Sequence, residues 1–240
     1  MDSSRIILFD LPSRPPNKCW SLNSWKSRLL LNLKGIDYKT EWLEYPDIKP
    51  RFVEHFPKDT EAYTIPTVLL PDGKYIMDSR KIANHLEAAH PSPPLHLDSP
   101  YLTKLEAIIP GLRDALKAVF MYLLPKRLLN EASLPYWYET RSKQLSMPVD
   151  EYHAEEGGDK AWKRAREILP KVTEMLKENE GPFFLGKTAS YADLVWAGYL
   201  LFWQRLGDDV FAELLKATGD AKVHEDLLDA VKPWSERADH

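Results

Sequence analysis

Two short segments of the sequence carry groups that could bind a small peptide. The first places Pro66 directly after Ile65, at the head of an apolar run over residues 67–70. A proline removes a backbone N–H from a strand, so this position favours a bend, often with a cis bond, that leaves the Ile65 N–H and C=O for a peptide-like partner. The second segment, Asp78-Ser79, offers a carboxylate and a hydroxyl where a helical pattern begins. Together they favour a small zwitterionic peptide over a nucleotide, although each alone also fits an edge-strand proline or a helix cap.

The first third of the chain alternates strand and helix signals. Apolar residues such as Trp25, Leu29 and Leu33 recur at helical spacing, and Gly35 ends that pattern. The sequence predicts strands over residues 6–9, 38–43, 67–70 and 75–77, and helices over residues 24–34, 48–56 and 79–89. Residues 71–74 favour a hairpin between the last two strands. The order βαβ, α, ββα predicts an α/β domain of thioredoxin-like type over residues 1–90.

A proline-rich segment separates this region from one without strand signals. Residues 91–98 contain Pro91-Ser92-Pro93-Pro94, which favours a linker because proline interrupts helices. The chain beyond it predicts an all-helical domain over residues 99–240, with helices over residues 101–129, 136–145, 160–179, 192–206, 210–215 and 224–231. The charged run over residues 155–159 is predicted to be a solvated loop. The fold class is therefore α/β followed by all-α.

Composition excludes several classes of function. The chain has 240 residues, 44% of them hydrophobic, and a net charge of −4, so it lacks the basic footprint of a nucleic-acid binder. The apolar run over residues 6–9 is too short for a signal peptide, and no segment is long enough to span a membrane. The only cysteine, Cys19, excludes an internal disulfide and fits a reducing compartment, so we expect a cytoplasmic protein. Phosphate-binding glycine motifs and paired histidine spacing are absent from the sequence, so no metal or nucleotide is expected.

A helix-capping motif stands late in the chain. Ser190 and Asp193 have capping-box spacing, and Ala189 and Leu194 occupy the positions of a hydrophobic staple. We expect this motif to begin a helix and to act in folding, at about 1–2 kcal/mol for the cap.

These motifs resemble the cytosolic glutathione transferases over essentially the full length of the chain. The Ile65-Pro66 and Asp78-Ser79 segments resemble the glutathione-binding signature of that family, and residues 188–194 resemble the N-cap motif of its core helix. Residues 19–28 and 38–48 are similar to the fungal-specific class A transferases, which are related to bacterial β-etherases. The resemblance implies a thioredoxin-like domain followed by a helical domain, glutathione as co-substrate, and a homodimer.

The resemblance also implies roles for individual residues. Ile65, before a cis Pro66, would pair its backbone with the cysteinyl part of glutathione. The Asp78 carboxylate would face the γ-glutamyl ammonium, while the Ser79 hydroxyl and the helix N-terminal amides would face the carboxylate. The segment over residues 48–63 is shorter than expected for the class, so the contact to the glycine carboxylate stays open among four basic residues: Lys49, Arg51, His55 and Lys58.

Catalysis in this family requires glutathione as a thiolate, because the thiol is a poor nucleophile. A helix N-terminus with a hydroxyl donor lowers the thiol pKa by about one to several units. Ser21 aligns with the position where related transferases place a catalytic serine or cysteine. Ser24 is the second candidate, and Asn23 could add a hydrogen bond to the sulfur. As an alternative, either serine could be only the N-cap of the helix.

The electrophile is expected to bind between the two domains. Eight tryptophans and eleven tyrosines favour an apolar pocket with a few polar groups, although most aromatic residues at helical spacing belong to the core. The candidate pocket residues are Trp20, Tyr101, Phe120, Tyr122, Trp196, Tyr199 and Trp203.

The sequence is compatible with three functions. The leading one is conjugation of glutathione to aromatic or isothiocyanate-like electrophiles in detoxification, with reduction of organic hydroperoxides as a second activity. The second is a carrier, or ligandin, for aromatic or phenolic small molecules. The third is thiol transfer through a mixed disulfide at Cys19, which lies two residues before the expected position and has no Cys-x-x-Cys partner. An inactive interaction module is disfavoured by the intact Ile65-Pro66 and Asp78-Ser79 segments. The physiological electrophile and the dimer interface stay open.

Overall fold

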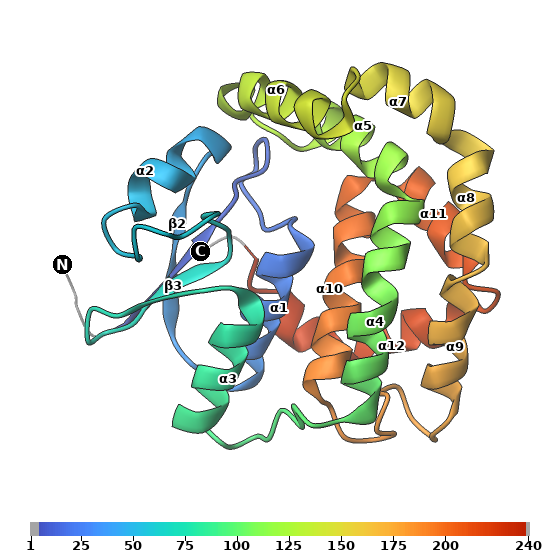
Figure 1. Cartoon of the computed structure of the whole chain (residues 1–240). Coiled ribbons are helices and arrows are strands. Elements are labelled where there is room, and N and C mark those ends of the chain that lie inside the picture. The colour runs from blue at the N-terminus through green and yellow to red at the C-terminus, as the bar shows by residue number, and fades with distance from the viewer. Residues whose placement is uncertain (1–4, 239–240) are drawn as a thin grey trace.

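The computed structural model describes residues 5–238 and places a mixed α/β layer beside a bundle of helices (Figure 1). The N-terminal elements follow the predicted order. They are β1 (Ile6–Asp10), α1 (Leu22–Leu33), β2 (Tyr38–Trp42), the 3₁₀ turn η1 (Tyr45–Asp47), α2 (Ile48–Phe52), β3 (Thr67–Leu69), β4 (Tyr75–Met77) and α3 (Ser79–Ala89). The thioredoxin-like topology predicted for this half of the chain is confirmed.

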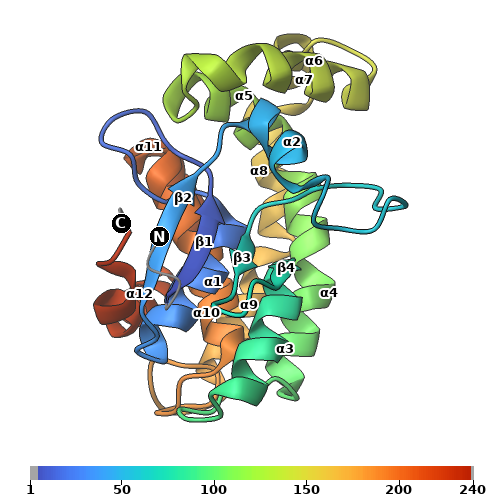
Figure 2. The ribbon, with the colours of Figure 1, turned by 90° about the vertical axis from the view of Figure 1, so that its left-hand side faces the viewer.

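The four strands form one sheet in the order β2-β1-β3-β4 (Figure 2). β1 and β2 are parallel, whereas β3 runs antiparallel to both β1 and β4. Leu8, Phe9 and Val68 are fully buried at the centre of the sheet, as expected of apolar runs covered on both faces.

A buried ion pair ties α1 to the sheet. The Nε of Arg28 donates to the Oδ2 of Asp10 at 2.8 Å, and its Nη2 donates to Thr40 Oγ1 at 2.8 Å. Both charged side chains have no exposed surface, and Asp10 Oδ1 also accepts the Leu11 N–H. Such a pair is tolerated because hydrogen bonds satisfy both partners. It joins α1 to β1 and β2 and so holds the start of α1 beside the end of β1.

The second half of the described chain is helical throughout. Its helices are α4 (Pro100–Ala115), α5 (Lys117–Arg127), the 3₁₀ turn η2 (Glu131–Ser133), α6 (Leu134–Leu145), α7 (Val149–Glu156), α8 (Gly158–Arg166), α9 (Leu169–Lys177), α10 (Tyr191–Leu206), α11 (Asp208–Ala217) and α12 (Ala221–Ser235). The all-helical prediction is confirmed, with α3 ending at Ala89 and α4 beginning at Pro100. The division at residues 90 and 99 stays a prediction.

Two long predicted helices are each divided. The helix predicted over residues 101–129 breaks at Leu116, whose φ of −102° and ψ of 8° leave the helical region. The helix predicted over residues 160–179 breaks before Pro170, which lies in the first turn of α9. Proline is favourable in a first turn and disrupts a helix interior, so the sequence supports a new helix at this point.

The prediction of a solvated loop over residues 155–159 was wrong. Glu156 ends α7, Gly157 caps it, and Gly158 begins α8. The Glu156 carboxylate pairs with Lys160 Nζ at 2.6 Å and with Arg164 Nη1 at 2.7 Å. The two glycines therefore mark a sharp turn between two helices, and the charges around them stabilise that turn.

The predicted capping box at the start of α10 is present and buried. The Ser190 N–H and hydroxyl both donate to Asp193 Oδ2 at 2.7 Å, and Asp193 Oδ1 accepts the Phe184 N–H at 2.8 Å. α10 is buried along most of its length and packs against α1. The Tyr191 hydroxyl donates to the Ser79 carbonyl at 3.1 Å, which links the helical half to α3.

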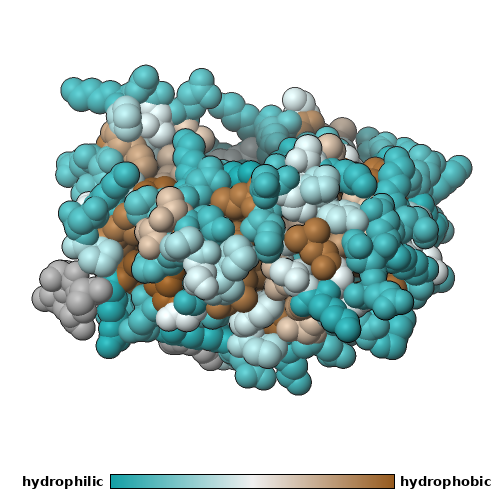
Figure 3. Space-filling view, turned by 90° about the horizontal axis from the view of Figure 1, so that it is seen from below, coloured by the Kyte–Doolittle hydropathy of each residue, from teal (hydrophilic) through white to brown (hydrophobic). Residues whose placement is uncertain are grey.

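The surface seen from below is largely hydrophilic, with hydrophobic side chains exposed in separate patches (Figure 3). Within residues 5–238, no helix combines the length and apolar character needed to cross a membrane.

Candidate functional site

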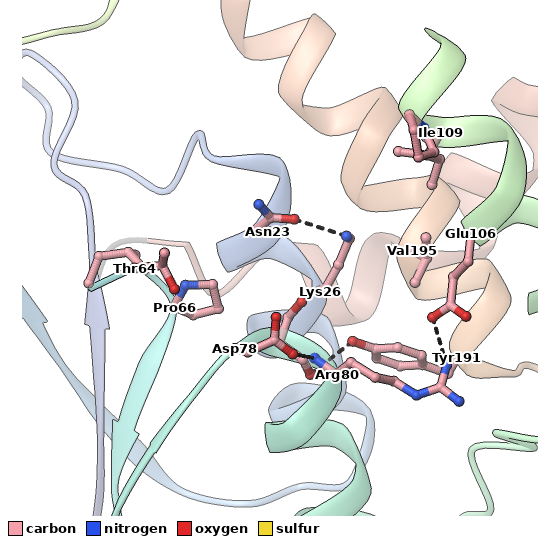
Figure 4. A pocket seen from close by; sticks show the side chains of 13 residues that line it. Asn23, Lys26, Thr64, Pro66, Asp78, Arg80, Glu106, Ile109, Tyr191 and Val195 are labelled. Atoms are coloured by element: carbon pink, nitrogen blue, oxygen red, sulfur yellow. Dashed lines mark hydrogen bonds and ion pairs between the residues drawn. The ribbon is translucent and has the colours of Figure 1, made fainter. Parts of the chain in front are cut away.

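Three adjoining cavities lie between the two halves of the chain, and Asn23 lines all of them. We call the first, of ≈ 320 Å³, the charged cavity: it is lined by Lys26, Ile65, Asp78, Arg80 and Glu106 among others (Figure 4). The second, of ≈ 430 Å³, is the aromatic cavity, with Trp20, Phe120, Tyr199 and Trp203 in its wall. The third, of ≈ 620 Å³, is the loop cavity, bordered by α2, α6 and residues 60–65.

Neighbouring cavities share several lining residues besides Asn23. Ile65 lines both the charged cavity and the loop cavity, and Ser21 lines both the loop cavity and the aromatic cavity. Thr64 is likewise shared by the charged and loop cavities, Tyr45 and Arg141 by the loop and aromatic cavities, and Ile109 by the charged and aromatic cavities. The three spaces therefore adjoin one another as one site, with Ile65 and Ser21 in shared walls.

The Ile65-Pro66 segment has the arrangement that the sequence predicted. Its peptide bond is cis, and Pro66 lines the charged cavity beside Thr64. The Thr64 carbonyl accepts a hydrogen bond from Thr67 Oγ1 at 2.9 Å, and the Pro66 carbonyl accepts one from the Asp78 N–H at 3.2 Å. Within residues 5–238, the Ile65 backbone makes no backbone hydrogen bond. Its N–H and C=O are therefore available to a peptide ligand.

Asp78 differs in part from its expected role, because it caps α3. Its Oδ1 accepts the N–H groups of Arg80 at 2.9 Å and Lys81 at 3.1 Å, and its backbone φ is +87°. These first-turn amides were expected to face a ligand carboxylate, and the cap occupies them instead. Asp78 and Ser79 still offer Asp78 Oδ2, the Ser79 N–H and the Ser79 hydroxyl to a ligand, whereas the Ser79 carbonyl accepts from Tyr191.

Three charged residues of the charged cavity were missed from the sequence. Lys26 Nζ donates to Asn23 Oδ1 at 2.9 Å, and Arg80 Nη1 pairs with Glu106 Oε1 at 2.8 Å (Figure 4). Burial lowers the pKa of Lys26, while Asp78 and Glu106 oppose that shift. The spacing of Asn23 and Lys26 on one helix could have suggested the first contact. Nothing in the sequence could have shown that Glu106 of α4 meets α3.

Ser21 and Ser24 lie in different surroundings. Ser21 directly precedes α1 in extended conformation, and its half-buried side chain does not cap the helix. Ser24 is fully buried, its hydroxyl has no hydrogen-bond partner among the described residues, and it lines none of the three cavities. Of the two, only Ser21 is placed to contact a ligand.

Cys19 is placed unfavourably for nucleophilic chemistry. Its side chain is fully buried and outside the three cavities. Burial, together with the nearby Asp10 carboxylate, raises the pKa of the Cys19 thiol well above its ordinary value. Its N–H donates to the Ala238 carbonyl at 2.8 Å, which anchors the chain on the side away from the site. The thiol therefore stays protonated and inaccessible.

Three of the aromatic residues expected in the pocket lie outside the aromatic cavity. Tyr101 instead donates to Glu178 Oε2 at 2.7 Å and stacks on Phe184. Tyr122 stacks on His153 with ring centroids 3.9 Å apart, and Trp196 is buried in the core, where its Nε1–H donates to His224. These three residues do not line the aromatic cavity, because they occupy helix faces turned towards other partners.

Four basic residues were candidates for a glycine carboxylate. Lys49 and Lys58 line the loop cavity close to Ile65 in the site. Arg51 pairs with Glu41 at 2.9 Å and donates to the Tyr75 hydroxyl, and His55 stacks on the Tyr75 ring. The geometry therefore reduces the candidates to the two lysines.

Family models match both halves of the chain. The model described as glutathione S-transferase, N-terminal domain, matches residues 20–89, and the one described as glutathione S-transferase, C-terminal domain, matches residues 112–234. The chain belongs to the glutathione S-transferase family. The chain also resembles solved fungal members of the family along nearly its whole length. A glutathione S-transferase of Ceriporiopsis subvermispora, solved in complex with glutathione, is 30% identical, with 96% of this chain and 97% of that chain covered and a TM-score of 0.79.

Two further relatives support the fungal resemblance. Glutathione transferase GSTFuA2 from Phanerochaete chrysosporium is 25% identical, with 98% of this chain and 99% of that chain covered and a TM-score of 0.83. A curated relative, glutathione S-transferase-like protein ustS of Aspergillus flavus, is 29% identical over 237 residues, which cover 89% of this chain and 86% of the relative. The resemblance to fungal class A transferases is thus confirmed.

Proposed function

We propose that this protein binds glutathione across the three cavities and conjugates it to hydrophobic or aromatic electrophiles, with Ser21 stabilising the glutathione thiolate. The observation that carries the proposal is the position of Ile65 and Ser21 in walls that neighbouring cavities share. Ile65, whose backbone makes no backbone hydrogen bond within residues 5–238, lines the charged and loop cavities, and Ser21 lines the loop and aromatic cavities. A bound tripeptide would thus reach both ends of its site with its thiol facing Ser21.

The charged cavity suits the γ-glutamyl end of glutathione. Lys26 and the Ser79 hydroxyl offer donors to its carboxylate, while Asp78 Oδ2 and Glu106 offer acceptors to its ammonium. Both signs of charge line one small cavity, which matches a zwitterion better than it matches an anion or a cation. Lys49 and Lys58 in the loop cavity would then bind the glycine carboxylate.

Ser21 can act together with the start of α1. The hydroxyl stands before the helix N-terminus, where the peptide dipoles favour a negative charge. A thiolate placed there accepts a hydrogen bond from the Ser21 hydroxyl, and Asn23 lies within the same cavity wall. The thiol proton passes to solvent, and the sulfur attacks an electrophile held against the aromatic cavity; with chlorodinitrobenzene the new C–S bond replaces the C–Cl bond, and chloride leaves to solvent. Catalysis rests on thiolate stabilisation and proximity.

Substitution of single residues tests these roles. We expect Ser21→Ala to lower kcat/KM for conjugation of chlorodinitrobenzene by about 10²-fold, as loss of one donor to a developing anion does. Ser24→Ala is the matched control, because it removes a hydroxyl that lies outside the cavities. Cys19→Ser should also retain activity. Loss of activity at Cys19 with activity retained at Ser21 would instead support thiol transfer.

A carrier function is the second candidate, and the volume and aromatic wall of the aromatic cavity favour it. Micromolar binding of aromatic compounds without turnover of any electrophile would establish the carrier. Reduction of organic hydroperoxides, a cytoplasmic location and a homodimer are further parts of the proposal. The molar mass in solution, measured by light scattering, tests whether the protein is a homodimer.

A further inference from the structure

We propose that the electrophile or carried ligand is an aromatic anion, bound with its ring in the aromatic cavity and its negative group at the cavity mouth. The proposal rests on the proposed function and names the substrate class of the same site. Three cationic side chains, Arg113, Lys117 and Arg141, line this cavity, and Asp114 is the acidic residue among its lining side chains. The cavity wall is thus cationic in a chain whose net charge is −4.

The three cations come from separate helices and line one cavity. Arg113 belongs to α4, Lys117 begins α5, and Arg141 lies in α6. Within the described residues, none of the three takes part in a salt bridge. Their charge is therefore not neutralised inside the protein, and an anion that enters the cavity supplies the missing partner.

Arg141 is the best placed of the three for a planar anion. Its guanidinium carbon lies 4.5 Å from the ring centroid of Trp137 and 5.8 Å from that of Tyr45. Burial raises the pKa of Tyr45 to about 12, while the neighbouring Arg141 guanidinium opposes that shift, and a neutral phenol supplies no counter-charge to Arg141. Arg141 Nη1 donates to Thr140 Oγ1 at 3.3 Å, and the other N–H groups of the stacked guanidinium can bind a carboxylate or sulfonate.

Exposure divides the cavity into an apolar inner wall and a charged mouth. Trp20, Tyr199 and Trp203 are buried, whereas Arg113 is exposed and Lys117 and Arg141 are half-buried. A ligand that matches this gradient has an aromatic body and an anionic group at one end. A neutral aromatic compound would fill the inner wall and leave the three cations unpaired.

Two dyes that differ by one charged group test the proposal without any catalytic readout. Anilinonaphthalene sulfonate and neutral phenylnaphthylamine share a ring system, and only the first carries an anion. We expect the protein to bind the sulfonate at least about 10-fold more tightly at low salt, and added salt to reduce that preference. Arg113→Gln and Arg141→Gln should each raise the Kd of the sulfonate about 5-fold and change the Kd of the neutral dye less than about 2-fold.

Lys143→Gln is the matched control. Lys143 is a cation of α6, as Arg141 is, but its side chain is exposed and does not line the aromatic cavity. The proposal predicts no change in either dye for this variant. Equal affinity of the protein for both dyes, or an equal weakening of both dyes by Arg141→Gln, would overturn it.

Conjugation provides a second and separate readout. Chloronitrobenzoate and its methyl ester are electrophiles that differ by the same kind of charge. The ratio of kcat/KM for the acid to that for the ester should fall about 5-fold in Arg141→Gln and stay constant in Lys143→Gln. A protein that conjugates neither compound but prefers the sulfonate dye would contradict the proposed enzymatic function and leave the anion preference standing. Unchanged ratios in an active enzyme would contradict the anion preference alone.

Discussion

A Cβ atom on Gly198 would lie 3.1 Å from the carbonyl oxygen of Leu22, in the first turn of the opposing helix α1. The same atom would lie 3.2 Å from the Cβ of Trp25. The absence of a side chain therefore lets α10 approach α1 just after Ser21. Because α10 also places Tyr199 in the aromatic cavity, this contact sets the proposed catalytic hydroxyl relative to the electrophile.

Enlarging this glycine should disturb the contact. We expect Gly198→Val to lower the free energy of unfolding by about 2–3 kcal/mol, because neither the Leu22 carbonyl nor the Trp25 backbone can move cheaply. Gly111 of α4 is the matched control, since a Cβ there would lie 3.6 Å from Ile168 Cδ1, an ordinary contact. Gly111→Ala should raise stability by about 0.5–1 kcal/mol. Urea unfolding measures both variants, and a Gly198→Val protein as stable as the wild type would contradict this role.

His224 should make the protein sensitive to acid. Its Nδ1 accepts the Trp196 Nε1–H at 2.9 Å, and its Nε2 lies 2.9 Å from Thr173 Oγ1, whose hydroxyl donates to Thr218. Burial lowers the pKa of His224 from 6.5 to about 4, so the folded protein holds the neutral ring. This contribution to stability is complete above pH 6.5 and is lost as the pH falls through about 4. Over this pH range His224 lowers the free energy of unfolding by about 3 kcal/mol in total.

A variant comparison isolates this effect. Burial raises the pKa of Asp193 to about 6. The contribution of Asp193 to the free energy of unfolding therefore grows as the pH falls from about 6 towards 3.8, which opposes the loss caused by His224. His224→Gln should be less stable than the wild type at neutral pH and should approach it under acid. Urea midpoints measured at several pH values test this expectation. If the midpoints of the two proteins change with pH in parallel, His224 is not the source of the acid sensitivity.

Asp193 should stabilise the fold far more than an exposed cap. Its carboxylate accepts three hydrogen bonds, and an asparagine in its place would turn an NH₂ group towards at least one N–H or O–H donor. We expect Asp193→Asn to lower the free energy of unfolding by about 2–4 kcal/mol. Asp220, the half-exposed cap of α12, provides the control, and Asp220→Asn should cost less than about 1 kcal/mol. Equal losses in the two variants would show that burial of the motif adds nothing.

Two tyrosines of α10 should respond in opposite directions to loss of a hydroxyl. The Tyr199 hydroxyl is buried with no hydrogen-bond partner in the described chain, so Tyr199→Phe should raise stability by about 1 kcal/mol. The Tyr191 hydroxyl donates to the Ser79 carbonyl, so Tyr191→Phe should lower stability by about 1 kcal/mol. Thermal and urea unfolding give both values. A loss at Tyr199 as large as that at Tyr191 would reveal a partner for the Tyr199 hydroxyl.

The fold was largely predictable because its signals are local. Alternation and helical spacing within a few residues identified the strands and most helices, and Ser190 and Asp193 identified the start of α10 from their spacing alone. The division of long helices depends on single positions. Pro170 could have been read as the start of a helix, whereas the break at Leu116 has no mark in the sequence and follows from packing.

The candidate site was predictable only in part, because it joins residues distant in the chain. The proline before a strand was enough to predict the cis bond between Ile65 and Pro66. Asp78, in contrast, was equally consistent with a ligand contact and with the helix cap that it forms. Helical spacing marks Trp196 and Tyr199 alike as apolar, and only the packing of α10 decides which of them reaches the cavity. Glu106 was missed because its partner Arg80 lies 26 residues away in the chain, on a different helix.

The pKa of the glutathione thiol on the protein tests the central claim most directly. Thiolate absorbance in the ultraviolet, measured against pH for the wild type, Ser21→Ala and Ser24→Ala, reports this pKa without any electrophile. We expect the wild type and Ser24→Ala to hold the thiol pKa at least about one unit below the free value of about 8.5, and Ser21→Ala to return it most of the way. A bound thiol that titrates identically in the wild type and in Ser21→Ala would contradict the assignment of Ser21 as the thiolate-stabilising residue.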